Sequence, residues 1–382
     1  MELYIHIPFC KSKCRYCDFA SYAGQEQKMS AYVDALLEEA AVRAAQLQYP
    51  QMDTVFIGGG TPSLLPAHLL DRLLSGLKEL FPLSPGAEFT SEANPGTLTC
   101  EWLTAAVSHG VNRISMGMQA YQPELLRTLG RIHTFDEVKE SVALCREHGV
   151  KNISLDLMFG LPGQTEAQWL ETLRMALTLE PEHLSCYGLI PEEGTPLTAD
   201  LKSGRLSLPD EEAERRMYDV ALALLHSHGY EQYEISNFAL PGYECRHNLG
   251  YWRQIPYLGL GASASSMLRN TPEVFCLRET NPPSLEEYLR MCRNQAWTCR
   301  ETVAVSPEEA RFETLMLGLR TTQGVSEAAY AALHRRSLHE DYGDRLYPLM
   351  QQGFLQHQDG WWSLTRKGMD VQNAVLVELM DD

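Results

Sequence analysis

The stretch Cys10-Lys11-Ser12-Lys13-Cys14-Arg15-Tyr16-Cys17 brings three thiols together within eight residues. It follows a short apolar run, residues 3–9, that is typical of a β-strand. Such close spacing lets one loop turn all three sulfurs towards a common point, which is what a metal ion or an iron–sulfur cluster requires of its ligands. We therefore expect the rest of the chain to be arranged around this loop.

The cysteine spacing leaves two kinds of site open and favours one of them. A structural zinc ion takes four ligands in a closed tetrahedron, usually from two paired knuckles. The chain has no second C-x₂-C pair, and His6, which could complete such a site, sits on the predicted strand, where a hydrogen-bonded core histidine is commoner. Three thiolates instead suit a [4Fe–4S] cluster with one iron open for a further ligand. We predict Cys10, Cys14 and Cys17 as cluster ligands.

Composition and charge exclude several classes of function. The 382 residues carry a net charge of −18 with a pI near 5.1, whereas a general nucleic-acid binder needs a basic surface. No apolar run approaches the roughly 20 residues of a membrane helix, and the N-terminus lacks the pattern of a signal peptide. We therefore expect a cytoplasmic protein with reduced cysteines. Seven scattered cysteines are interpreted as small buried residues: Cys100, Cys145, Cys186, Cys245, Cys276, Cys292 and Cys299.

Beyond the loop, helical and strand patterns alternate. Residues 30–49 repeat apolar side chains at helical spacing, and Thr54-Val55-Phe56-Ile57 is typical of a buried parallel strand. About six β–α alternations fill the first 190 residues, which predicts an α/β fold with a parallel sheet and helical crossovers. Six units with polar residues at the strand ends favour an incomplete, TIM-like (β/α)₆ barrel over a doubly wound sheet. The periodicity alone does not decide between the two.

The pattern changes towards the C-terminus. We assign residues 1–235 to the α/β core, residues 236–300 to a connecting segment that is irregular up to residue 264, and residues 301–382 to a small C-terminal domain. This last region has short helices and two strands joined by Asp359-Gly360, a strong hairpin signal, so it outlines a helical, winged-helix-like module. Its seven Lys and Arg residues stand against thirteen Asp and Glu residues, which favours a structural or lid-like role over DNA binding.

Glycines and polar side chains follow the predicted strands. Gly58-Gly59-Gly60-Thr61-Pro62 ends one strand, where residues without Cβ let the backbone approach a ligand, although a plain turn is the simpler alternative. Glu92, Gln119 and Asp156 fall at later strand ends, and Arg131 lies on a loop after the fourth strand. Each of them alone suits a helix cap or a loop ion pair. Ligands of parallel α/β folds gather at the carboxyl ends of strands, so together they predict a binding site.

The spacing C-x₃-C-x₂-C after a first strand, followed by β–α repeats, resembles the radical S-adenosylmethionine superfamily. The resemblance implies that S-adenosylmethionine chelates the open iron through its amino and carboxylate groups. In such proteins the cofactor supplies the radical chemistry, while the protein places and shields it. Tyr16, just before the last cysteine, fits the same pattern. The resemblance also implies that the glycine-rich segment contacts the methionine amino group.

The order and surroundings of the polar residues resemble one branch of that superfamily, the anaerobic coproporphyrinogen III dehydrogenases and their relatives. The resemblance runs from Tyr4 to Pro196 and resumes in the C-terminal region, so it covers most of the chain. Under it, Glu92 and Asp156 suit ribose hydroxyls or the ammonium, and Arg131 suits the carboxylate. The implied contacts of S-adenosylmethionine are Tyr4, Gly59, Gly60, Thr61, Glu92, Gln119, Arg131 and Asp156.

Two features separate the chain from the dehydrogenases of that branch. The dehydrogenases carry a fourth cysteine two residues after the third, where this chain has Phe19. They also carry an N-terminal arm that helps to build the substrate site, whereas only nine residues precede Cys10 here. Both departures argue against coproporphyrinogen III dehydrogenase activity.

A third feature, His247-Asn248-Leu249-Gly250-Tyr251-Trp252, reads as H-N-x-x-Y-W and resembles the signature of the HemW family of heme chaperones. A histidine flanked by aromatic residues is a suitable axial ligand for heme iron, with the rings packing against the macrocycle. The alternative is that His247 only hydrogen-bonds within a loop while Trp252 anchors that loop in the core. The family resemblance and the missing fourth cysteine favour heme, so we predict His247 as a heme-binding residue.

The resemblance implies a heme chaperone that binds heme and transfers it to acceptor proteins. It also implies a [4Fe–4S] cluster with exchangeable S-adenosylmethionine, and no residue is assigned a catalytic role. The alternative is a radical enzyme acting on a porphyrin, either the dehydrogenase or a methyl-transferring or heme-degrading relative. The implied partners are heme and heme-acceptor proteins. Acceptors of the respiratory chain, peripheral membrane contact and a homodimer stay open.

Overall fold

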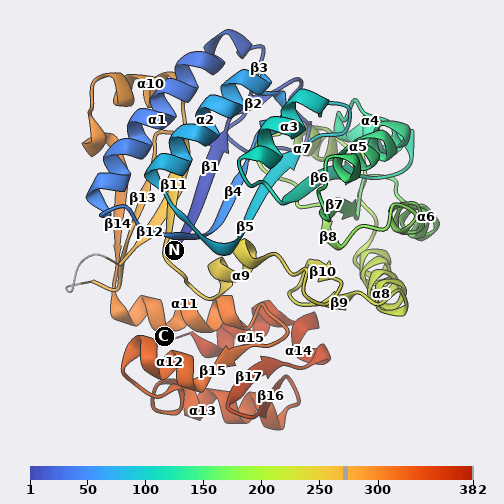
Figure 1. Cartoon of the computed structure of the whole chain (residues 1–382). Coiled ribbons are helices and arrows are strands. Elements are labelled where there is room, and N and C mark those ends of the chain that lie inside the picture. Colours follow the sequence, from blue (N-terminus) through green and yellow to red (C-terminus); the bar gives the residue numbers. More distant parts are fainter. Residues whose placement is uncertain (270–273, 381–382) are drawn as a thin grey trace.

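The computed structural model describes residues 1–269 and 274–380, and its main element is one large sheet (Figure 1). The strand order is β14-β13-β12-β11-β1-β4-β5-β6-β7-β8-β10-β9. Six of these strands follow one another in chain order, each parallel to the one before. They are β1 (Glu2–Ile7), β4 (Met52–Gly59), β5 (Leu83–Ala93), β6 (Arg113–Gln119), β7 (Asn152–Phe159) and β8 (His183–Gly188). The predicted α/β fold is confirmed, and the curvature of a TIM-like barrel stays a prediction.

Helices form the crossovers between these strands. They are α1 (Met29–Gln46), α2 (Ala67–Leu80), α3 (Cys100–Ser108), α4 (Pro123–Leu129), α5 (Phe135–Glu147) and α6 (Glu166–Leu177). Each helix buries apolar residues, as α2 does with leucines at helical spacing, and all of β6 is buried. Because each crossover makes the next strand parallel to the one before, the carboxyl ends of the six strands lie at the same end of the sheet.

A second group of strands extends the sheet beyond β1. β11 (Tyr257–Leu260) pairs in parallel with β1, and β12 (Ser265–Leu268), β13 (Cys276–Thr280) and β14 (Glu301–Val305) continue it in antiparallel fashion. The other α-helices and strands between β8 and β14 are α7 (Pro196–Lys202), α8 (Glu211–Ser227), β9 (Glu231–Gln232), β10 (Asn237–Ala239), α9 (Arg246–Trp252) and α10 (Leu285–Arg293).

The expectation of an irregular stretch over residues 237–264 is wrong, because it contains α9 and β11. These elements are short, and β11 exists through its pairing with β1, more than 200 residues away in sequence, which no local pattern reports. The boundaries at residues 235 and 300 stay predictions, with the segment between them supplying strands to the main sheet.

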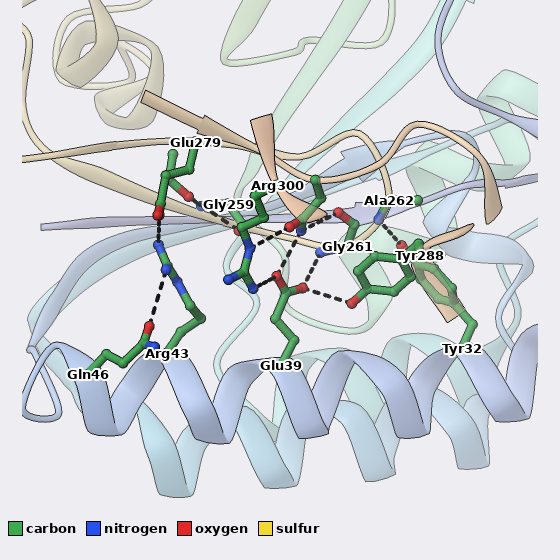
Figure 2. A network of polar contacts seen from close by, with 12 residues as sticks. Tyr32, Glu39, Arg43, Gln46, Gly259, Gly261, Ala262, Glu279, Tyr288 and Arg300 are labelled. Atoms are coloured by element: carbon green, nitrogen blue, oxygen red, sulfur yellow. Dashed lines mark hydrogen bonds and ion pairs between the residues drawn. The ribbon is translucent and has the colours of Figure 1, made fainter. Parts of the chain in front are cut away.

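A buried polar network fastens this extension to α1 (Figure 2). Glu39 of α1 is 0% exposed and accepts four hydrogen bonds. The donors are Arg300 Nη2 and Asn281 Nδ2 at 2.8 Å each, the Gly261 backbone N–H at 2.9 Å and the Tyr288 hydroxyl at 2.8 Å. Since a buried carboxylate requires partners of this kind, the network joins α1, α10 and the segment before β14 into one unit.

The C-terminal region has a hydrophobic core of its own. Its elements are α11 (Pro307–Gly318), β15 (Val325–Ser326), α12 (Glu327–His334), α13 (Leu338–Gln351), β16 (Leu355–Gln358), β17 (Trp361–Leu364), α14 (Arg366–Asp370) and α15 (Gln372–Leu379). The strands form a sheet in the order β15-β17-β16, with the hairpin of β16 and β17 turning at Asp359-Gly360 as predicted. Both turn residues have positive φ, which this two-residue loop requires. The helical C-terminal domain is confirmed.

Two smaller expectations can be compared with the structure. Five of the scattered cysteines are buried as interpreted, but Cys100 and Cys299 are exposed, because they lie at the start of α3 and just before β14. Within the described residues, no helix combines the length and the apolar character that a membrane span requires. The last two residues of the predicted C-terminal domain, and residues 270–273 of the connecting segment, lie outside the described residues.

Candidate functional site

The three clustered cysteines lie on the loop after β1. The two-residue strands β2 (Phe9–Cys10) and β3 (Tyr22–Ala23) pair with each other and close the base of this loop. Cys10, Cys14 and Cys17 are free and partly exposed, and all three line one cavity of about 240 Å³. Among the described residues, no three His, Cys, Asp or Glu side chains converge closely enough to hold a single metal ion. The thiols are instead arranged around a shared space.

Polar groups from two neighbouring loops contact the cysteine sulfurs. The Thr61 hydroxyl donates to Cys10 Sγ at 3.7 Å, and Arg131 Nη1 donates to Cys14 Sγ at 3.6 Å. Burial raises the pKa of the Cys10 thiol, and hydrogen bonding from Thr61 acts in the opposite direction. Donors of this kind stabilise thiolates, the form in which cysteine binds iron. The donor set therefore fits an iron–sulfur cluster.

His6, the alternative fourth ligand of the cysteine site, serves a different purpose. It is 6% exposed, and both of its ring nitrogens have partners. Nδ1 shares a hydrogen bond with the Tyr4 hydroxyl at 2.9 Å, and Nε2 is 2.9 Å from the Ala20 carbonyl oxygen. Burial lowers the pKa of His6, so the imidazole is neutral and donates to Ala20. His6 is the hydrogen-bonded core histidine that its strand position indicated.

The strand-end residues converge on the same cavity as the thiols. Most residues of the predicted S-adenosylmethionine site line it, together with Tyr16 from the cysteine loop. They are Gly59, Gly60, Glu92, Gln119, Arg131 and Asp156. Thr61 lines an adjoining cavity that also contains Cys14 and Arg131. Tyr4 is not brought to this place, because it lines a separate cavity beside α9.

The glycines at the end of β4 are required because neighbouring residues leave no room for a Cβ atom. At Gly59 φ is +108°, and a Cβ would lie 2.4 Å from the His6 ring. At Gly60 a Cβ would lie 2.7 Å from the Phe9 carbonyl oxygen. Packing is thus one reason for the glycines, and their contact with a ligand stays a prediction, since both line the cavity. The glycines let β4 approach the start of the cysteine loop, and the Gly59 N–H donates to Glu92 Oε2 at 2.9 Å.

Two partly buried carboxylates, those of Glu92 and Asp156, line the cavity. Burial and, after it, the charge of Asp156 raise the pKa of Glu92 to about 7, against the opposing effect of the hydrogen bond from the Gly59 N–H. Burial also raises the pKa of Asp156, which accepts from the Ser115 hydroxyl at 3.1 Å. A ligand that supplies hydroxyl or ammonium donors would stabilise the ionised form of carboxylates whose pKa is raised in this way.

Arg131 supplies the positive charge of the cavity. Its Nη2 donates to Asn94 Oδ1 and to the Gly117 carbonyl oxygen, each at 2.7 Å, which fixes the guanidinium beside Cys14. Its Nε is buried and has no partner within the protein. A buried N–H without an acceptor indicates that an acceptor from outside the chain completes the site.

The predicted site omits several polar residues that line this cavity: Ser12, Ser21, Asn94, Ser115 and Tyr187. Tyr187 donates its hydroxyl hydrogen to Gln119 Oε1 at 3.0 Å and lies near the end of β8. The strand-end rule, applied to the sixth strand as well as to the earlier ones, would have found Tyr187. Asn94 follows Glu92 by two residues, and the same rule reaches it.

His247 lies outside this cavity, on α9. It is 1% exposed, and its ring stacks on Phe56 with the centroids 5.2 Å apart. Nδ1 shares a hydrogen bond with Thr54 Oγ1 at 2.7 Å, and Nε2 shares one with the Tyr251 hydroxyl at 2.9 Å. Burial, aided by the charge of Arg113, lowers the pKa of His247 to about 3, so the ring is neutral. Bonding to heme iron requires one of these contacts to break, and the axial role stays a prediction.

Known protein families match two parts of the chain, and curated relatives match nearly all of it. The family described as "Radical SAM superfamily" matches residues 4–176, and the "HemN C-terminal domain" matches residues 305–371. A curated relative named "Heme chaperone HemW" from Bacillus subtilis is 39% identical over 97% of this chain and 97% of its own length. One of the same name from Escherichia coli is 36% identical, over 98% and 97%.

Among solved structures, the fold is similar to that described as coproporphyrinogen III oxidase (HemN) from Escherichia coli, a radical SAM enzyme. The TM-score is 0.84 with 24% identity, and the similarity covers 99% of this chain and 89% of that one. At this identity the likeness shows the fold alone. The identity to the curated relatives is higher and extends over nearly the whole chain, including the C-terminal domain. The chain therefore belongs to the HemW family of the radical SAM superfamily.

Proposed function

We propose that this protein is a heme chaperone that binds heme and transfers it to acceptor proteins. The observation that carries the proposal is membership of a family whose curated relatives bear that name, at up to 39% identity over 97% of the chain. Phe19 in place of the fourth cysteine of the dehydrogenases supports it. Heme acceptors of the respiratory chain, peripheral membrane contact, a homodimer and a cytoplasmic location belong to the same proposal. Ten free cysteines support the reducing compartment.

In this proposal Cys10, Cys14 and Cys17 hold a [4Fe–4S] cluster. When bound, the cluster would supply an open iron, which an amino acid can chelate, and a source of one electron. The protein holds the thiols around one cavity, and Thr61 and Arg131 donate to their sulfurs. These contacts support the donor set, because thiolates need nearby hydrogen-bond donors when they are removed from water.

The same cavity is proposed to bind S-adenosylmethionine. Glu92 and Asp156 orient its hydroxyl or ammonium donors, and Arg131 offers its unpartnered Nε to a carboxylate. Gly59, Gly60, Thr61, Gln119 and Tyr16 shape the walls. A contact from Tyr4 stays a prediction, since that residue lies on the separate cavity beside α9.

The raised pKa of Glu92 predicts that binding of S-adenosylmethionine depends on pH. Glu92 has a pKa of about 7, so it is neutral below that pH and ionised above it. Because the ionised form accepts hydrogen bonds more strongly, affinity for S-adenosylmethionine should fall as pH decreases through 7. We expect binding at pH 6 to be about tenfold weaker than at pH 8. Calorimetric titration of the cluster-loaded protein measures this.

Glu92→Gln provides the comparison for that measurement, because the amide keeps the shape and cannot ionise. The variant should show a nearly flat profile, apart from titration of the ligand itself. Glu124→Gln, an exposed substitution on α4, should keep the slope of the wild type. Equal slopes in Glu92→Gln and the wild type would contradict the role of Glu92.

A heme titration tests the function directly. The purified protein, incubated with hemin, should develop a Soret band that saturates with one heme per chain, and His247→Ala should weaken it. Mixing the heme-loaded protein with an apo-cytochrome should then move the band to the acceptor. Absence of hemin binding by the wild-type chain would exclude the chaperone function.

A second candidate function is a radical enzyme acting on a porphyrin. The observation that favours it is that the thiols and most of the strand-end residues gather around one cavity, in the fold of a coproporphyrinogen III oxidase. The reconstituted protein, supplied anaerobically with coproporphyrinogen III and S-adenosylmethionine, tests it. Oxidative decarboxylation at a rate comparable to that of the dehydrogenases would replace the chaperone proposal.

A further inference from the structure

Asn94 lies between two side chains that donate to the cysteine sulfurs. It directly follows β5 and lines both the cavity of the three thiols and the smaller cavity beside it. Its Nδ2 is 2.8 Å from Thr61 Oγ1, and its Oδ1 is 2.7 Å from Arg131 Nη2. Thr61 in turn contacts Cys10, and Arg131 contacts Cys14. A continuous chain of hydrogen bonds thus joins two of the three proposed cluster ligands.

The direction of each hydrogen bond in this chain follows from the chemistry of Arg131. A guanidinium has five N–H donors and no acceptor, so the Asn94 atom that faces it is the carbonyl oxygen. The amide nitrogen of Asn94 then faces Thr61 and donates to its hydroxyl oxygen. Because that oxygen accepts, the Thr61 hydroxyl directs its own hydrogen to Cys10 Sγ at 3.7 Å. The amide of Asn94 therefore decides that Thr61 donates to the sulfur.

The backbone of Asn94 is fixed independently of its side chain. Its N–H donates to Ser63 Oγ at 3.3 Å, and its carbonyl oxygen accepts from the Thr97 hydroxyl at 2.6 Å. Gly117 leaves the space in which the two side chains meet, because a Cβ there would lie 3.0 Å from Arg131 Nη2 and 3.3 Å from Asn94 Oδ1. A change confined to the amide should thus alter the chain of hydrogen bonds and leave the loop in place.

Hydrogen bonds to sulfur affect an iron–sulfur cluster in a defined direction. Reduction adds one negative charge to the cluster, and a donor to a thiolate stabilises negative charge. Donors to the sulfurs therefore raise the reduction potential, and their removal lowers it. Thr61 is 2% exposed, so little water can replace its hydrogen at Cys10. The orientation of this one hydroxyl should consequently be measurable in the potential.

We propose that Asn94 is a positioning residue for the cluster. Its amide nitrogen directs the Thr61 hydroxyl toward Cys10, and its carbonyl oxygen holds the Arg131 guanidinium beside Cys14. Asn94 acts through these two neighbours and not by contact with iron. The inference rests on the proposed function, since it needs the cluster that the three thiols are proposed to hold.

Asn94→Asp tests the inference, because the carboxylate keeps the shape of the amide but has no donor. The oxygen that replaces Nδ2 would accept from the Thr61 hydroxyl, whose hydrogen then turns away from Cys10. We expect the equilibrium to favour the oxidised cluster by about tenfold more, which is a potential about 59 mV more negative for one electron. Dithionite titration of the reconstituted protein with redox mediators, followed by electron paramagnetic resonance and without S-adenosylmethionine, measures the shift.

Because Asn94→Asp also adds a negative charge, a double-mutant cycle with Thr61→Val separates the two causes. Thr61→Val removes the hydroxyl, so it should lower the potential by itself. In that background Asn94→Asp should lower the potential much less than it does in the wild type. Ser12→Asp, exposed on the same two cavities, is the matched charge control and should give the same shift in both backgrounds.

The outcomes separate the inference from the function on which it rests. If Asn94→Asp lowers the potential equally with and without the Thr61 hydroxyl, only its charge acts, and the inference is wrong although the cluster stands. An unchanged potential in Thr61→Val would overturn the inference as well. If the wild type holds no iron after reconstitution, the proposed cluster fails and the inference with it.

The rate at which a chelator removes iron from the oxidised protein gives the same cycle without reduction. Asn94→Asp should lose iron about tenfold faster than the wild type, as variants beside metal ligands do. In the Thr61→Val background Asn94→Asp should add little to the rate. A rate equal to that of the wild type in a folded Asn94→Asp variant would contradict the positioning role, and far-ultraviolet circular dichroism checks the fold.

Discussion

Replacing Cys14 with alanine is expected to abolish the iron–sulfur cluster. The three thiols of the loop after β1 line one cavity, and a three-thiolate site has no spare ligand among them. Changes beyond the ligands of a metal site already cost about 10–100-fold in metal affinity, so loss of a ligand should reduce bound iron at least that far. The measurement is iron content per chain after anaerobic reconstitution, together with the visible absorbance of the cluster.

The chain offers matched controls for this prediction. Cys100 and Cys299 are free and exposed, and they lie far from the loop in sequence, so Cys100→Ala and Cys299→Ala should load like the wild type. Cys10→Ala and Cys17→Ala should fail in the same way as Cys14→Ala. Full iron loading in a folded Cys14→Ala variant would mean that another group completes the site, and the assignment of the three ligands would then be wrong.

That the polar residues of successive strands gather around one cavity was predictable for a topological reason. Glu92 and Gln119 lie at the ends of β5 and β6, and Asp156 lies in the second half of β7, three residues before its end. Parallel strands joined by crossovers bring these parts of the chain together at the carboxyl end of the sheet. No knowledge of side-chain packing was needed. The same rule missed Tyr187 only because it was not applied to the sixth strand.

The residues near α9 could not be predicted in that way. Tyr4 lies inside β1, where the face that it presents depends on strand pairing, and β1 pairs with both β4 and the distant β11. The motif that begins at His247 resembles a heme-binding signature, but the sequence does not show what the imidazole contacts. Those contacts come from Thr54 and Phe56 of β4, nearly 200 residues away in sequence.

The role of Glu39 was hidden for a similar reason. A glutamate on an amphipathic helix is normally expected on the solvent-exposed face. Its four donors come from residues 261–300, so only the tertiary structure reveals that this carboxylate is fully buried. A sequence pattern indicates which face of a single helix or strand is apolar, whereas a buried polar network is formed by several elements together.

This network carries the second large effect that we expect. Arg300→Met should destabilise the protein by about 3–5 kcal/mol, because it removes the cation from a buried pair and leaves the carboxylate uncompensated. The pair is 2.8 Å apart, with the two side chains 6% and 0% exposed, so water cannot replace the lost partner. Urea unfolding followed by circular dichroism gives the free energy of unfolding for each variant.

Arg290→Met is the matched control, since it lies on the neighbouring α10 and pairs with Glu287 at 3.9 Å on the surface, 69% exposed. Such pairs contribute about 0–1 kcal/mol, so this variant should unfold like the wild type. The double variant Glu39→Gln with Arg300→Met should recover part of the loss, because no buried charge then remains. If Arg300→Met unfolds like Arg290→Met, water or another cation reaches Glu39, and the network does not hold the strand extension against α1.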